Sequence, residues 1–114
     1  MKVRFVADND LIRQTGLMHQ KPLDPDECAY FYFDRKGRHS FWNKNVDFPI
    51  SVIFVDANQR VKDIKYLKAQ QTEGIYPETS DIQHVVEAHV DAPNQYGIKQ
   101  GSVLKVKNGE VVFE

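Results

Sequence analysis

The run from Pro49 to Val55 is apolar at every position except Ser51. A strand with one solvated face alternates apolar and polar residues, whereas a strand covered on both faces reads as a continuous apolar run. The run therefore predicts a strand that is buried on both faces. Such a strand lies inside a sheet, between neighbouring strands that the rest of the chain has to supply.

Other segments also favour β structure, and most are separated by turn residues. Further strands are predicted at Lys2–Ala7, Ala29–Phe33, Arg38–Asn45, Arg60–Leu67, His84–Val90, Val103–Val106 and Val111–Phe113. Asp34–Gly37 is expected to be a hairpin turn in which Gly37 supplies a positive φ angle. Asp56–Gln59 is expected to form a second hairpin turn, and Asn108 with Gly109 predicts a third.

Helical signals are few. Asp8, Asn9 or Asp10 can cap a short N-terminal helix, because each side chain can accept a free amide proton of the first turn. Gly16 is expected near the end of that helix or at a close packing contact. A second short helical turn is predicted near residues 92–96.

The polar stretch Lys68–Asp81 contains Gly74 and Pro77 and is predicted to be a long surface loop. The remaining pattern gives about seven or eight short strands with one or two short helices. We therefore expect residues 1–114 to form one mainly β domain, a compact barrel or sandwich.

The charge balance argues against two classes of partner. The chain has 15 basic and 16 acidic side chains and a net charge of −1, and its basic residues are not clustered. Binding to duplex nucleic acid or to an anionic membrane requires clustered Lys and Arg. We expect neither partner and no cofactor. The sequence does not indicate an oligomeric state.

Two features bear on the cellular compartment. Taken as full length, the chain lacks a signal peptide and a transmembrane segment, so a cytoplasmic protein is expected. Cys28 is the only cysteine, which rules out an internal disulfide. Because Cys28 precedes a β run and has no histidine nearby in sequence, we interpret it as a packed thiol rather than a nucleophile.

Five stretches, which form three motifs, occur in order. They are Arg13–Met18 (RQTGLM), Ser40–Asn45 (SFWNKN) followed by Pro49–Asp56, and Val85–Glu87 (VVE) followed by Tyr96–Ser102. In composition, order and spacing they resemble the motifs of the uncharacterised DUF192 (UPF0127) family over nearly the whole chain. The resemblance implies a compact, mainly β structure. It implies no particular activity, because the family has no established general function, and its relatives can be exported.

The chain departs from the pattern of that family at several positions. Asn43 stands where the family usually has Met, Ser51 where its strand usually has Asp, and Ser102 where its last turn usually has Asp. The Pro-Cys pair that follows the central hairpin in the family has no match here. The resemblance is therefore to a divergent member.

Trp42, Lys44 and Asn45 form the clearest polar constellation. On a strand, Trp42 and Lys44 would share one face and Asn45 would take the other. In one interpretation Trp42 stacks on a ligand such as a sugar while Lys44 or Asn45 hydrogen-bonds it, and Arg13 and Met18 line the same pocket. In the other, Trp42 fills the core, Asn45 shapes a turn and Lys44 extends its charge into solvent.

Glu87 is the main candidate for acid chemistry, and two interpretations are open. It can form a structural ion pair with Arg13, which would keep the carboxyl ionised. It can instead act with Asp56 or Asp47 as one of the two carboxylates that glycoside hydrolysis requires. Asp56 also lies in a predicted turn, where Asp is favoured for backbone reasons.

Three histidines invite a metal interpretation. His84 and His89 lie at a spacing that would place them on opposite faces of a straight strand, and His39 is remote in sequence. The chain has no HxH or HExxH pattern. We therefore predict no metal site.

The leading hypothesis is a small non-enzymatic binding or accessory domain with a pocket near Trp42 and Lys44. Its ligand would be a small polar molecule such as a carbohydrate, or a peptide. The first alternative is a glycosidase-like hydrolase that uses Glu87 and a second carboxylate. The second alternative is an interaction domain that works through a sheet edge or an oligomer interface.

Overall fold

The computed structural model describes residues 1–114 and confirms that the chain is mainly β. In chain order, the elements are β1 (Lys2–Ala7), α1 (Asp10–Thr15), β2 (Glu27–Gly37), β3 (Ile50–Asp56), β4 (Val61–Leu67), β5 (Ile82–His89), α2 (Ala92–Gln95), β6 (Leu104–Lys107) and β7 (Glu110–Phe113). The number of strands agrees with the sequence pattern.

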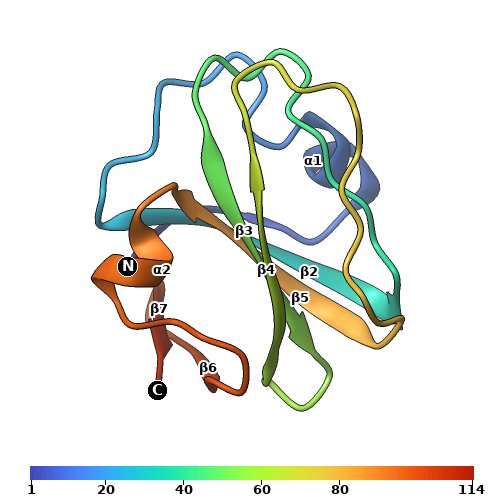
Figure 1. The fold of residues 1–114 in the computed structure, drawn as a ribbon, viewed down its shortest axis with the longest axis vertical. Helices are drawn as coiled ribbons and strands as arrows, with labels where there is room; N and C mark the ends of the chain where they lie inside the picture. Colours follow the sequence, from blue (N-terminus) through green and yellow to red (C-terminus); the bar gives the residue numbers. More distant parts are fainter.

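All the strands join one 7-stranded sheet in the order β4-β3-β5-β2-β1-β7-β6. β1 and β2 run parallel, and the other neighbours run antiparallel. Two parallel strands need a crossover connection, and α1 lies in it. The sheet curls so that β3 and β4 cross over β2 and β5 in Figure 1, which gives the chain the shape of a half-barrel.

The two edge strands of the curled sheet meet at one point. Arg60, just before β4, and Val103, just before β6, form an isolated β-bridge. The Leu104 amide also donates to the Gln59 carbonyl at 2.7 Å. These contacts tie the beginnings of β4 and β6 together, so backbone groups that would otherwise remain exposed at the sheet edges are paired.

Every residue of β3 is buried, as its continuous apolar run predicts. Its side chains divide between two hydrophobic clusters, because successive residues of a strand point to opposite faces. Val52 and Phe54 belong to the larger cluster, whereas Ile53 and Val55 belong to the smaller one. Both faces of the central strand are therefore covered.

The predicted hairpin turn at Asp34–Gly37 and the predicted strand at Arg38–Asn45 are wrong. β2 continues to Gly37, whose φ angle is not positive, and pairs there with β5. The following segment is irregular, and Phe41 makes only an isolated bridge to Ile75. Because β2 finds its partners in β1 and β5, which are distant in sequence, the segment after it is free to leave the sheet.

The short helix α1 begins and ends as its sequence predicts. Asn9 is the N-cap, and its side chain accepts a hydrogen bond from the Ile12 amide at 3.0 Å. Gly16 ends the helix with a φ angle of 47°, a conformation that glycine adopts more easily than other residues. No helix of the structure is long and apolar enough to cross a membrane.

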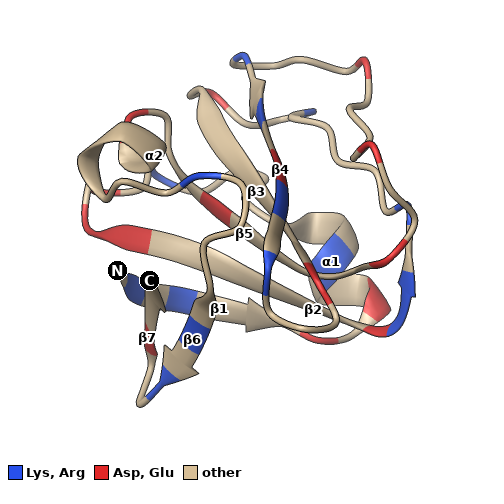
Figure 2. Cartoon of the chain, turned by 60° about the horizontal axis from the view of Figure 1, so that its bottom comes forward, with Lys and Arg blue, Asp and Glu red and all other residues tan.

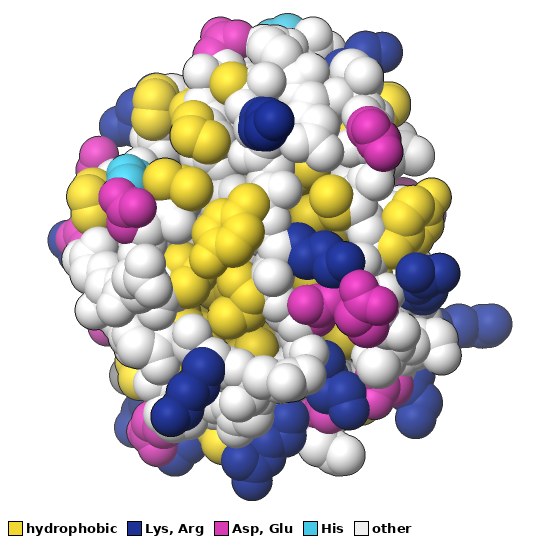
Figure 3. Space-filling view, in the orientation of Figure 1, with side chains coloured by type: hydrophobic (Ala, Val, Ile, Leu, Met, Phe, Trp, Pro, Cys, Tyr) yellow, Lys and Arg dark blue, Asp and Glu magenta, His cyan; other side chains and the backbone are white.

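Charged residues of both signs are interspersed along the chain, as Figure 2 shows. On the face seen in Figure 3, hydrophobic side chains gather near the centre and charged side chains lie around them. This mixed surface agrees with the nearly balanced charge of the sequence.

Candidate functional site

A cavity of about 550 Å³ lies between α1 and the irregular segment 40–46, on the side of the sheet that carries the larger hydrophobic cluster. Its lining residues are Asp10, Arg13, Gln14, Thr15, Gly16, Leu17, Met18, Phe31, Phe33, Ser40, Phe41, Trp42, Asn43, Lys44, Val46, Gly74, Tyr76 and Glu87. The volume falls within the range of pockets that bind small molecules.

Trp42 and Lys44 both line this cavity, although the segment that carries them is not a strand. The Trp42 residue is 47% exposed, so it does not fill the core. The Lys44 ammonium lies 5.5 Å from the centroid of the Trp42 ring, within the range of a cation–π interaction. No carboxylate pairs with Lys44, which leaves its charge available to a ligand.

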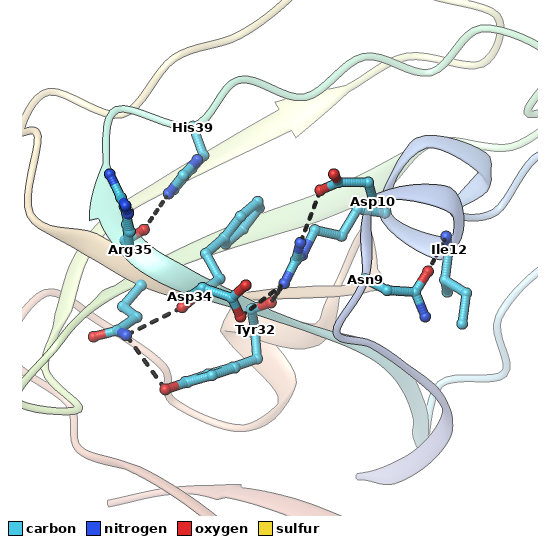
Figure 4. Close-up of polar contacts among 10 residues, drawn as sticks. Asn9, Asp10, Ile12, Tyr32, Asp34, Arg35 and His39 are labelled. Atoms are coloured by element: carbon cyan, nitrogen blue, oxygen red, sulfur yellow. Dashed lines mark hydrogen bonds and ion pairs between the residues drawn. The ribbon is translucent and has the colours of Figure 1, made fainter.

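Arg13 lines the cavity, but its guanidinium is already bonded to other groups of the protein. Its Nε and Nη2 atoms donate to the Tyr32 carbonyl at 2.9 and 2.6 Å, and Nη1 donates to Asp10 at 3.1 Å. Figure 4 shows these contacts, together with an ion pair to Asp34 at 3.6 Å. The predicted ion pair between Arg13 and Glu87 is therefore wrong. Because α1 lies beside β2, the guanidinium reaches the β2 backbone and not the Glu87 carboxyl.

Glu87 lies on β5, between Ala29 of β2 and Val52 of β3 in the register of the sheet. The residue is only 3% exposed, yet it lines the cavity, and no side chain or backbone group of the protein hydrogen-bonds its carboxyl. Burial raises the pKa of Glu87 to about 8, because the ionised form loses its hydration and no cation replaces it. At neutral pH the carboxyl is mostly protonated and can both donate and accept a hydrogen bond.

The other two predicted ligand-binding residues differ in their placement. Met18 lines the cavity, just beyond the end of α1. Asn45 does not line it. Asn45 adopts a φ angle of 59°, its amide donates to the Gln70 side chain at 3.1 Å, and its carbonyl accepts from the His19 amide at 3.0 Å. Asn45 therefore shapes a turn, which was the alternative interpretation of this residue.

Neither acid considered as a partner of Glu87 lines the cavity. Asp56 accepts hydrogen bonds from the amides of Asn58 and Arg60, each at 2.9 Å, and so stabilises the turn between β3 and β4. Asp47 accepts a hydrogen bond from the Gln70 side chain. Both carboxylates serve the local backbone or a neighbouring loop.

The histidines are dispersed, and no three His, Cys, Asp or Glu side chains come together in a group that could hold a metal ion. His39 stacks on the Phe33 ring with 3.7 Å between the ring centroids. His84 is buried, and its Nδ1 lies 2.7 Å from the Tyr30 hydroxyl. Burial lowers the pKa of His84, which favours the neutral ring.

Cys28 is fully buried in the smaller hydrophobic cluster. Burial raises the pKa of its thiol to about 12, because a thiolate would be poorly solvated there. The residue is a packed thiol, as the sequence indicates, and not an activated nucleophile.

Sequence reasoning missed most of the aromatic lining. Phe31, Phe33, Phe41 and Tyr76 join Trp42 around the cavity. Phe31 and Phe33 alternate along β2 and so share a face, which was a usable signal. Tyr76 gave no such signal, because it comes from the long polar loop and reaches the cavity only through the fold.

The fold and the cavity define a small half-barrel β protein with a pocket beside its N-terminal helix. A family model for DUF192, described as an uncharacterized ACR, matches residues 2–106, and the chain belongs to this family. A search of curated proteins gives no significant match.

Two solved structures share the fold. A protein of unknown function from Novosphingobium aromaticivorans superposes with a TM-score of 0.84 at 23% identity, over 91% of this chain and 75% of the other. A putative transcription regulator from Sinorhizobium meliloti superposes with a TM-score of 0.82 at 21% identity, over 88% of this chain and 78% of the other. At these identities the similarity establishes the fold alone.

Proposed function

We propose that the protein is a small-molecule-binding domain and that the cavity beside α1 is its binding site. The observation that carries this proposal is Glu87, a buried carboxyl that opens into a cavity without any hydrogen-bond partner in the protein. No fully buried side-chain oxygen or nitrogen of the structure lacks a hydrogen-bond partner, so the Glu87 oxygens, which no protein group bonds, meet the open space of the cavity. A ligand that supplies the missing partner explains why an acid is kept there.

The remaining lining supports a ligand with a flat or ring-shaped body. Trp42 presents its half-exposed ring at the cavity, and Phe31, Phe33, Phe41 and Tyr76 also line it. Aromatic rings stack on the faces of sugars and of aromatic compounds, while a few polar groups fix the orientation. The composition of this cavity fits that pattern.

The hydrolase alternative has less support. Of the acids near the cavity, only Asp10 and Glu87 line it, and Asp10 pairs with Arg13. Asp56 and Asp47 lie outside the lining. Glu87 has the raised pKa expected of a general acid, but paired-carboxylate hydrolysis also needs a second acid at a defined separation.

The proposal can be tested by a thermal-shift screen of sugars, aromatic acids and short peptides, followed by calorimetry on each hit. A ligand of the native state raises the melting temperature by mass action. A hit should be weakened at least about tenfold by Trp42→Ala, the loss expected for a stacking contact of about 1–3 kcal/mol. Val112→Ala, an exposed residue of β7 outside the cavity lining, is the matched control and should bind normally. Hits that Trp42→Ala and Glu87→Leu leave unaffected would place the binding site elsewhere.

A further inference from the structure

All three cation–π pairs of the structure involve an aromatic residue of the cavity lining. Arg13 lies over Phe33 at 5.1 Å, and Arg38 lies over Tyr76 at 5.3 Å. Lys44 over Trp42 is the third pair. Three cationic side chains therefore lie at or beside the cavity, and two of them, Arg13 and Lys44, line it.

The three cations differ in how far the protein itself satisfies them. Arg13 pairs with Asp10, and its other nitrogens donate to a backbone carbonyl. Arg38 Nε donates to the Pro77 carbonyl at 2.8 Å. The Lys44 ammonium has no hydrogen-bond or carboxylate partner in the protein. Lys44 is therefore the one cation of the lining that no protein group pairs with.

Glu87 does not cancel that charge. Its carboxyl is buried among apolar groups, between two strands that present Ala29 and Val52 beside it. The charged groups that line the same cavity are Asp10 and Arg13, which pair with each other, and Lys44. A carboxyl without a nearby cation retains its proton, so it offers an O–H to the ligand and not a negative charge.

We propose that the ligand of this cavity is a small organic acid. Its carboxylate binds the Lys44 ammonium, and a hydroxyl or carbonyl oxygen at its other end accepts a hydrogen bond from the Glu87 carboxyl. The ring of the ligand lies between these two ends, against the aromatic lining. This assignment rests on the proposed function, and it excludes amines, which would meet the unpaired Lys44 charge.

The test uses two matched series of probes at pH 7, with the full chain. One series is 4-hydroxybenzoate, 4-hydroxybenzyl alcohol and 4-hydroxybenzylamine, and the other is glucuronate, glucose and glucosamine. Trp42 is the single tryptophan of the chain, so its fluorescence reports binding at this cavity. In at least one series, the acid should bind about 10- to 100-fold more tightly than the neutral and cationic analogues, the range of a hydrogen bond to a charged group.

Variants of Lys44 test the assignment of the carboxylate. Lys44→Gln should abolish the preference for the acid, and Lys44→Arg should retain it because the charge is kept. Lys107→Gln, at the end of β6 and outside the cavity lining, is the matched control and should leave the preference unchanged. Tighter binding of the alcohol or the amine, or a preference that survives in Lys44→Gln, would overturn the assignment.

Glu87 is tested through the other end of the probe. The wild type should bind 4-hydroxybenzoate more tightly than benzoate, and Glu87→Leu should lose that difference while it still binds benzoate. Equal binding of the two acids by the wild type would contradict the role of Glu87.

If neutral or cationic probes change Trp42 fluorescence and acids do not, the binding function stands and the acid assignment fails. If none of the six probes binds, the acid assignment also fails, and the broader ligand screen then decides the binding function on its own.

Discussion

β5 carries two buried titratable residues, and the protein surrounds them in different ways. His84 lies 2.7 Å from the Tyr30 hydroxyl through Nδ1 and 3.5 Å from the Gln59 side chain through Nε2. Glu87 lies further along the same strand on the opposite face, and no protein group bonds its carboxyl. The first residue is a hydrogen-bonded part of the core, whereas the carboxyl of the second has no protein partner and faces a cavity.

Under the proposed function, His84 serves the fold and Glu87 serves a ligand. A hydrogen-bonded buried histidine costs the fold little, because its polar atoms exchange water for protein partners. A buried acid without partners destabilises the fold, and such groups gather at functional sites. Removing each group in turn should therefore have opposite effects on stability.

Of the two titratable residues, the larger effect is expected for Glu87→Gln, which should stabilise the protein. The pKa of Glu87 is about 8 in the folded protein and 4.5 in the reference state, so the folded protein binds more protons between these values. This difference in proton binding stabilises the folded protein fully below pH 4.5, and the stabilisation is lost as the pH rises toward 8. Glu87→Gln removes this loss and should stabilise the protein at pH 7 by about 3 kcal/mol.

Urea denaturation of both proteins at pH 5 and at pH 7 measures this effect. The advantage of Glu87→Gln should be much smaller at pH 5. Glu110→Gln, on the exposed part of β7, is the control and should change stability by less than about 0.5 kcal/mol. A variant less stable than the wild type at both pH values would show that the carboxyl has a partner in the folded protein.

Tyr30→Phe should destabilise the protein, the opposite of the effect expected for Glu87→Gln. Its hydroxyl is the hydrogen-bond partner of His84 Nδ1, so the variant leaves a buried ring nitrogen unpaired. The expected loss is about 1–2 kcal/mol in chemical denaturation. Tyr66→Phe is the matched control, because Tyr66 is 52% exposed. Equal effects of the two substitutions would mean that the bond to His84 does not contribute to stability.

Trp42→Ala tests whether Trp42 contributes to ligand binding without contributing much to the stability of the core. Because Trp42 is half exposed, its removal should cost about 1 kcal/mol or less of stability, while ligand binding weakens at least about tenfold. Phe31→Ala, at 1% exposure in the same lining, should cost about 3–5 kcal/mol. Thermal unfolding of the two variants distinguishes them, and a comparable loss in both would make Trp42 a core residue.

The smallest effect is expected at acidic pH from His84. Burial lowers its pKa in the folded protein, and the charge of Asp56 partly opposes that shift. The unfolded chain therefore binds the proton first, and stability falls as the pH drops below 6.5. His84→Gln should flatten this part of the stability profile. An unchanged profile would assign the acid sensitivity to other groups.

The sequence predicted best where structure is local or where burial is complete. The apolar run of β3 and the turn at Asn108 and Gly109 specify their strands through pattern and turn chemistry alone. The strand prediction for residues 38–45 was wrong because the structure of this segment depends on the pairing of β2 with β5, which follows much later in the chain. Aromatic composition favours strands, but here the aromatic side chains line a cavity.

The candidate site was only partly predictable for a similar reason. Trp42 and Lys44 were singled out from their chemistry, and both line the cavity, while their binding of a ligand stays a prediction. The sequence could not show that the Glu87 carboxyl has no ion-pair partner, because Arg13 was a plausible partner on charge alone. Only the position of α1, which directs Arg13 to the Tyr32 carbonyl, separates the two possibilities.

The contact between Lys44 and Trp42 also has a consequence for selectivity. In the free protein the ammonium already covers one face of the ring at 5.5 Å from its centroid. A ring that arrives without an anionic group exchanges one favourable contact for another and gains little. A ligand whose carboxylate drew the lysine aside, as the proposed acid would, would uncover the ring and use both groups at once. The Lys44 side chain would then compete for the ring with flat molecules that lack the matching charge and so disfavour their binding.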